Sequence, residues 1–258
     1  MKKWILILGG LAALGIGAAA ALLVSINPIV EAGVNMYGPD ITGTHVHLKK
    51  ADISVFSGKG SLHEFTLGNP KGYSAPHAVK VAAVSMELDK DSLLEDVIVI
   101  KKIDIDSPDI IYEIAGKSNN FDDILKNVKQ LSAAEEKAAK AGGGASAKDE
   151  GKAKKVVIDE LTIRNAKAAV SLPALKLNLN TSLPDIRLTD IGRDKSGKNS
   201  GVSMAEAASR VLKAVSGSLG SASKDAVSKA RVSLTVGSEG LGKAAKSVGD
   251  KLKGLFGK

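Results

Sequence analysis

The sequence predicts a mainly β fold with some α structure: an elongated antiparallel sheet of repeated strands, one N-terminal transmembrane helix and C-terminal amphipathic helices. Three observations predict it: a recurring strand motif, a charge-free apolar run near the start, and a change to helical spacing after residue 200. They divide the 258 residues into an anchor (1–30), a first β-rich part (31–131), a linker of Lys, Glu, Ala and Gly (132–155), a continuation of the sheet (156–200) and a basic amphipathic helical tail (201–258).

The strand motif is an apolar residue, two polar residues, then apolar-polar-apolar. It occurs at Leu62–Leu67, Ile100–Ile105, Ile158–Ile163 and, more loosely, Leu183–Leu188. Because side chains alternate between the two faces of a strand, the last two apolar residues of each copy share a face. The second polar residue shifts the phase, as a β-bulge or a twisted strand entry would. The first three copies end at residues that break strands or favour turns, which indicates a modular sheet.

Other strands are expected from alternation between these copies. They are Ala51–Phe56, Val79–Leu88, Val97–Ile100, Ile110–Ile114, Ala168–Leu172 and Leu175–Leu179. The residues from 31 to the first of these strands are interpreted as a short juxtamembrane segment.

Two regions have helical spacing. Asn119 or Asn120 is placed to cap a helix whose first turn contains Asp122 and Asp123. Ser203 and Glu206 have the spacing of a capping box. The helix that begins at this capping box has an apolar stripe of Met204, Ala207, Ala208, Val211, Leu212 and Val215.

A last amphipathic stretch runs from Leu241 to Phe256, with Lys243, Lys246, Lys251 and Lys253 beside or opposite its apolar face. The C-terminal helices either cover the sheet, which we favour, or lie on a membrane surface, with these lysines facing anionic lipid.

The stretch from Trp4 to Val24 has no charge and the length that crosses a bilayer. Lys2 and Lys3 before it favour a cytoplasmic N-terminus. A cleaved signal peptide is the competing interpretation, but its apolar region is usually only ~7–15 residues, and here Leu22–Val24 follows the small residues. We therefore expect an anchor.

The formal net charge is +8, and the basic excess lies after residue 129. Aromatic residues make up only 3% of the chain and arginines do not cluster, which argues against a nucleic-acid partner. The absence of cysteine fits an oxidising compartment without disulfides and excludes a lipid-modified cysteine anchor.

No catalytic or metal-binding pattern stands out, so we expect neither an enzyme nor a cofactor. His45 and His47 would share a strand face and could hold a metal with His63 or His77, but no second spaced pair or partnered carboxylate accompanies them. Gly192–Asn199 is similar to a phosphate-binding loop, yet Asn199 stands where a Ser or Thr is required. Asp104, Asp106 and Asp109 alternate with Ile, as on the outward face of a strand.

Several short motifs resemble the N-terminal part of AsmA-like proteins, which are bacterial inner-membrane proteins with one N-terminal anchor. The motifs are Gly43–Val46, Ser57–Leu62, Phe65–Gly72, Asp91–Leu94, Ile98–Ile100, Ile103–Ile105 and Pro108–Glu113. The resemblance extends over residues 43–131 and returns over 156–170. It implies a curved, taco-like periplasmic sheet lined with aliphatic side chains and related to proteins that carry phospholipid between membranes. About 8–10 strands at about 4.8 Å spacing would extend only about 40–50 Å, which is short for a complete bridge.

With this resemblance, the anchor implies a single-pass protein of the bacterial inner membrane, with its N-terminus in the cytoplasm and its bulk in the periplasm. We expect it to bind or transfer membrane lipid in envelope assembly or maintenance. The alternative is an anchored structural protein that recruits an envelope partner through a sheet edge or its C-terminal helices. The residues expected to line the groove are Phe65, Leu67, Ile98, Ile100, Ile103, Ile105, Ile110, Tyr112, Leu161, Ile163, Leu175, Leu177 and Leu179. They could equally form the buried side of a sheet packed on helices.

Overall fold

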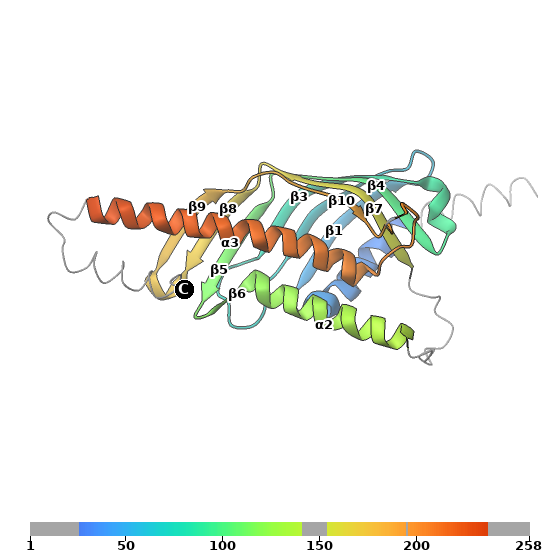
Figure 1. The fold of residues 1–258 in the computed structure, drawn as a ribbon. Helices are drawn as coiled ribbons and strands as arrows, with labels where there is room; N and C mark the ends of the chain where they lie inside the picture. The colour runs from blue at the N-terminus through green and yellow to red at the C-terminus, as the bar shows by residue number, and fades with distance from the viewer. Residues whose placement is uncertain (1–25, 141–153, 195, 237–258) are drawn as a thin grey trace, which may run out of the picture.

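The computed structural model describes residues 26–140, 154–194 and 196–236. Within these ranges, ten strands form one curled sheet, and helices α2 and α3 lie against one of its faces (Figure 1). The fold is therefore mainly β, as predicted, and its sheet has the shape of a half-barrel.

The strands follow the alternating segments of the sequence. They are β1 (Val46–Ser54), β2 (Lys59–Leu67), β3 (Val79–Leu88), β4 (Val97–Asp106), β5 (Asp109–Ala115), β6 (Ser118–Asn119), β7 (Lys155–Arg164), β8 (Lys167–Leu172), β9 (Leu177–Ser182) and β10 (Ile186–Ile191). The helices are α2 (Asn120–Lys140), α3 (Met204–Val236), the short 3-10 helices η1 (Lys90–Leu94) and η2 (Pro173–Leu175), and a helix over residues 26–42.

The sheet is mixed, so the expectation of an antiparallel sheet is wrong. β1, β2 and β3 pair antiparallel, but β4 pairs parallel with β7, and β5 pairs parallel with β8. β10 and β9 then pair antiparallel outside β7 and β8. Parallel neighbours need a long crossover connection, and α2 lies in the connection between β6 and β7.

The second and third copies of the motif are these parallel neighbours, in register. Ile100 is opposite Ile158, Ile103 is opposite Leu161, and the pairing continues to the end of both strands. The expected shift of phase is confirmed in the second copy, because the register between β3 and β4 shifts between Glu87 and Leu88 and leaves Lys101 unmatched.

The turn residues that end these two copies of the motif also lie side by side. Ser107 and Asn165 both have positive φ, 52° and 54°. The Ser107 N–H donates to the carbonyl of Arg164 at 2.9 Å, and the Asn165 amide donates to Asp106 at 2.7 Å. The strand pairs β4–β5 and β7–β8 therefore bend at the same level, which helps to curl the sheet.

The helix starts agree with their predicted caps. The Asn119 side chain accepts the N–H of Asp122 at 2.9 Å, and the Ser203 hydroxyl accepts the N–H of Glu206 at 3.2 Å. α2 continues to Lys140, so the segment expected as a linker or a solvated helix is helical in its first nine residues. Met204 was expected on the apolar stripe of α3 but is 56% exposed.

Within the segment expected to follow the membrane, the chain is helical up to residue 42, in a helix over residues 26–42, and β1 begins at Val46 rather than at Ala51. This helix lies along the free edge of β1. Asn35 exchanges two hydrogen bonds with the backbone of Leu48, at 2.7 and 2.9 Å. One edge of the sheet is thus closed by side chains of a helix.

No helix within the described ranges is both long enough and apolar enough to cross a membrane. The expected anchor, Trp4–Val24, lies outside the described residues. The stretch from Leu241 to Phe256, with its four lysines, also lies outside them.

Candidate functional site

The face of the sheet that α2 and α3 contact, here called the inner face, is almost entirely apolar. Residues directly opposite each other on paired strands share a face, so the strand register defines it. It comprises Val46, Leu48, Ala51 and Ile53 of β1; Leu62, Phe65 and Leu67 of β2; Val79, Val81, Val84, Met86 and Leu88 of β3; Ile98, Ile100, Ile103 and Ile105 of β4; Ile110, Tyr112 and Ile114 of β5; Val156, Ile158, Leu161 and Ile163 of β7; Ala168, Val170 and Leu172 of β8; Leu177 and Leu179 of β9; and Ile186, Leu188 and Ile191 of β10. In these strands only Gly60 and Thr181 interrupt it.

Twelve of the thirteen residues predicted to line a groove lie on this inner face. Leu175 lies in η2 instead and packs against the same side near Leu172. Five are buried: Leu67, Ile110, Tyr112, Leu161 and Ile163. The other eight are partly buried. The structure brings the predicted residues together, while their contact with lipid stays a prediction.

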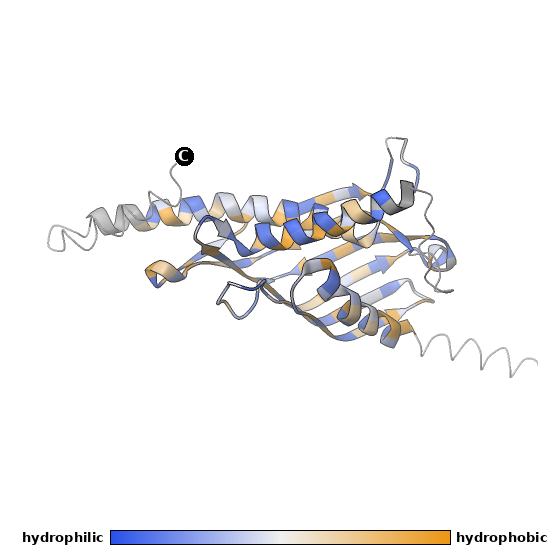
Figure 2. Cartoon of the chain, turned by 90° about the horizontal axis from the view of Figure 1, so that it is seen from below, coloured by the Kyte–Doolittle hydropathy of each residue, from blue (hydrophilic) through white to orange (hydrophobic). Residues whose placement is uncertain are grey.

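Helices α2 and α3 supply the other side of this core. α2 contributes Phe121, Ile124, Leu125 and Val128, and α3 contributes Leu212, Val215, Leu219 and several alanines. The favoured interpretation of the tail, that its helix covers the sheet, is therefore confirmed for α3. Figure 2 shows apolar residues along the strands and, mixed with polar ones, along the helices.

The cover is uneven. On β7 the inner-face residues Val156, Ile158, Leu161 and Ile163 are all buried. Their in-register neighbours on β4, namely Ile98, Ile100, Ile103 and Ile105, are all only partly buried. Leu62, Phe65 and Met86 on β2 and β3 are partly buried as well. These seven residues form a half-open strip, which α2 and α3 leave partly accessible.

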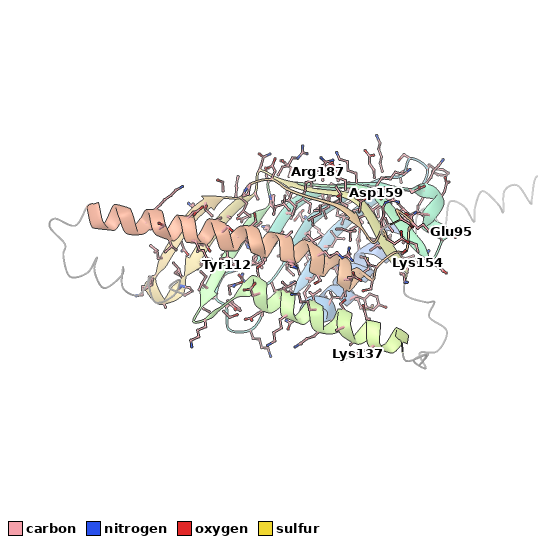
Figure 3. All side chains as sticks on the ribbon, viewed as in Figure 1. Glu95, Tyr112, Lys137, Lys154, Asp159 and Arg187 are labelled. Atoms are coloured by element: carbon pink, nitrogen blue, oxygen red, sulfur yellow. The ribbon has the colours of Figure 1, made fainter. Side chains whose placement is uncertain are left out.

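The opposite, outer face carries charged side chains in pairs. Arg187 contacts Glu160 at 2.5 Å across β10 and β7, and Arg193 contacts Asp159 at 2.6 Å. Figure 3 shows Arg187 on this outer side and Tyr112 on the side of the helices. The sheet thus separates an apolar face from a polar one.

The three aspartates that alternate with isoleucine have ordinary surface partners. Asp104 contacts Lys102 at 2.8 Å, and Asp109 contacts His77 at 3.1 Å. Hydrogen bonds from Asn165 and Ser107 lower the pKa of Asp106. This is the outward strand face that the alternation predicts.

Histidines and acidic residues do not gather into a metal site in the described part of the chain, where no group of three potential ligands was found. His63 lies 2.9 Å from the Ser61 hydroxyl, and the rings of His45 and His47 are 6.3 Å apart. In the loop after β10, Asp194 accepts hydrogen bonds from Ser196, Lys198 and Ser200, so its carboxylate closes the loop on itself.

A polar cluster behind β5 is a feature that sequence reasoning missed. Glu113, on the outer side of β5, is only 1% exposed, and its carboxylate accepts hydrogen bonds from the loop between β2 and β3. Asn120, fully buried, donates to Asn69 of that loop at 2.7 Å. Since all these groups have partners, the cluster holds the loop to α2. The sequence did offer a signal for this cluster, because Asn69 and Glu113 each lie in one of the motifs that resemble AsmA-like proteins.

A hollow of about 960 Å³ lies beside the outer strand β9 and the second half of α3. It is lined by small and polar residues, among them Ala168, Asn180, Ser182, Ala226 and Lys229. Its mixed lining differs from the aliphatic strip on β4.

These features define a class of protein: a curled, mixed-sheet half-barrel whose apolar inner face is partly covered by helices. The family model of the AsmA family matches residues 59–233, from β2 into α3, which is more than half of the chain. The chain therefore belongs to the AsmA family, as its motifs predicted, and this membership points to a function associated with the cell envelope. A search of curated proteins finds no match.

Proposed function

We propose that this protein binds or transfers lipid, phospholipid in particular, in the assembly or maintenance of the bacterial cell envelope, without catalysing a reaction. In this proposal residues 4–24 anchor it in the inner membrane and the sheet lies in the periplasm. The half-open strip on β4, β2 and β3 is the observation that carries the proposal, because it offers lipid an aliphatic surface that the protein does not fully cover.

An acyl chain needs no polar contact to bind such a surface. Each buried methylene contributes about 0.8 kcal/mol to the free energy of binding. Partial burial of one acyl chain along the four isoleucines of β4 therefore favours binding. The strip is partly exposed as it stands, and a chain can therefore reach it without displacement of α3.

The size of the sheet limits how the protein can act. At the level of β4, six strands lie abreast: β1, β2, β3, β4, β7 and β10. At about 4.8 Å spacing, they extend about 24 Å, which is shorter than the expected 40–50 Å because β5, β8 and β9 continue other strands rather than widen the sheet. This width suits the shelter of single lipid molecules and not a bridge between membranes.

Photo-crosslinking tests the proposal on the unchanged full-length chain. The protein is purified in mild detergent after growth with a photoactivatable fatty acid that the cell builds into its phospholipids. We expect crosslinks on peptides containing Ile98–Ile105. Crosslinks confined to other segments, or no lipid on the protein after detergent exchange, would refute the proposal.

A matched pair of substitutions locates the site. Ile103→Asp places a charge on the inner face, and Ala83→Asp places the same charge on an exposed outer position of β3. We expect Ile103→Asp to lose bound lipid and Ala83→Asp to retain it. Circular dichroism of both variants establishes whether they are folded, and equal lipid content in two folded variants contradicts the proposal.

The second candidate is an anchored interaction protein, which one observation favours. β9 is the outermost strand on its side and pairs only with β8, and its sequence Leu177–Ser182 contains no charge. Edge strands usually carry charges that prevent further pairing. If the chain acts in this way, a partner strand should protect the β9 amides from hydrogen exchange, and lipid should be absent.

A further inference from the structure

The helix over residues 26–42 has its polar side turned toward the protein. The Asn27 side chain accepts the N–H of Ile53 at 2.8 Å, and Glu31 accepts the N–H of Ala51 at 2.7 Å. Asn35 bonds both backbone groups of Leu48. Spaced four residues apart, these three side chains lie on one side of the helix and bond the backbone of β1.

The opposite side of this helix is apolar and exposed. Ile29 is 65% exposed, Met36 62% and Tyr37 56%, and the exposed Ala32 lies between them. This side carries no charge before Asp40. Val34 and Ile41 of this helix pack against the core, as on an ordinary surface helix, but Ile29, Met36 and Tyr37 face away from it.

A fourth exposed apolar residue lies near the start of this helix. Phe56, in the turn between β1 and β2, is 75% exposed. The bond between Asn27 and Ile53 brings the start of the helix next to the end of β1, just before this turn. Among the residues whose side chains the structure describes, five large apolar residues are this exposed, and four of them lie on this helix or in this turn.

We infer that Ile29, Met36, Tyr37 and Phe56 form a contact surface for the lipid bilayer, separate from any spanning segment. The charge-free run from Trp4 to Val24 ends shortly before this helix, so a membrane at that run lies next to the surface. Aromatic and long aliphatic side chains of an interfacial helix enter the boundary between head groups and acyl chains. The inference rests on the proposed membrane location, but not on lipid carriage.

A second copy of the chain fits this surface less well. A stable protein interface buries roughly 800 Å² on each partner, whereas four separated side chains on one helix and one turn offer much less. The contact would hold the turn between β1 and β2 against the bilayer. Ile53 and Gly60, at that end of the inner face, would then lie close to the lipid.

Site-directed spin labelling tests this surface in the full-length protein, which has no native cysteine. Single variants Met36→Cys and Phe56→Cys are labelled, and Met204→Cys serves as the control, because Met204 has similar exposure on α3. The proteins are reconstituted into vesicles of phosphatidylcholine and phosphatidylglycerol. Oxygen enters lipid and a nickel chelate stays in water, so the ratio of their collision rates reports immersion.

We expect an oxygen-to-nickel ratio several times higher at positions 36 and 56 than at 204. Equal ratios at all three positions would overturn the inference. Short label-to-label distances at position 36 that persist in detergent would overturn it too, and would show a second copy on this surface. Lipid bound to the same purified proteins is measured in parallel. Bound lipid tests the proposed function, and the collision ratio tests the contact surface, so failure of one is distinguished from failure of the other.

Discussion

The Glu113 carboxylate accepts the backbone N–H of Ser74 at 2.8 Å, although the two residues lie 39 positions apart and Glu113 is on the outer side of β5. The Ser74 hydroxyl and the N–H of Ala75 donate to the same carboxylate. A buried charge is tolerated only when such donors surround it. This contact fixes the loop between β2 and β3 against the sheet.

Removal of the Glu113 carboxylate should therefore destabilise the fold. We expect Glu113→Ala to lower the free energy of unfolding by about 2–3 kcal/mol, because two loop N–H groups lose their acceptor. Denaturant unfolding of the full chain in one detergent, followed by circular dichroism, measures the change. Glu87→Gln, at an exposed position of β3, is the control and should change little. A Glu113→Ala variant as stable as this control would contradict the role of the contact.

Because the helices cover the inner face unevenly, we expect the same substitution to lower the free energy of unfolding by different amounts at two paired positions. Ile158 is 6% exposed and its in-register neighbour Ile100 is only partly buried. We expect Ile158→Ala to cost about 3 kcal/mol and Ile100→Ala about 1 kcal/mol, because the second leaves a smaller cavity. The same unfolding measurement compares them. Equal costs would mean that β4 is covered as fully as β7.

Because the phenol of Tyr112 is buried, we expect the stability of the protein to change at high pH. Burial raises the pKa of Tyr112 to about 12, from an ordinary value of 10. A raised pKa means that the folded state keeps the phenol neutral, so this contribution is complete below pH 10 and is lost as the pH rises from 10 toward 12. We expect unfolding of Tyr112→Phe to depend less on pH in this range, by up to about 2 kcal/mol. Identical pH profiles for variant and parent would refute this assignment.

The bonds between the helix over residues 26–42 and β1 predict local protection of backbone amides. Asn35→Ala removes both partners of the Leu48 backbone, so we expect hydrogen exchange at Leu48 to be about tenfold faster. Asp40→Ala, an exposed position on the same helix, is the control. Mass spectrometry of peptides from β1 measures the exchange. Unchanged exchange in Asn35→Ala would show that other contacts close this edge.

The candidate site could be predicted in part because strand periodicity is local. Alternation within each copy of the motif was enough to place Ile103, Ile105, Leu161 and Ile163 on one face. The register shift at Lys101 could be predicted for the same reason, since two polar residues between apolar ones require a shift of phase. The caps at Asn119 and Ser203 also depend only on neighbours along the chain.

The helix over residues 26–42 could not be recognised in this way. Its apolar residues are divided between the core, which Val34 and Ile41 contact, and the outside, and its polar residues bond the edge of β1, so periodicity does not indicate a buried helix. Likewise, Asn69 and Glu113 lie in separate motifs, and only the folded chain brings their loop and strand together.

The sequence by itself determined most of the strands, the apolar identity of the inner face and the caps of α2 and α3, because each depends on residues a few positions apart. The tertiary structure decided that two copies of the motif pair in parallel, that α3 covers β7 more fully than β4, and that a helix closes the edge of β1. These outcomes depend on contacts between segments far apart in the chain, where many pairings satisfy the same local pattern and only the packing of the whole sheet and its helices selects one.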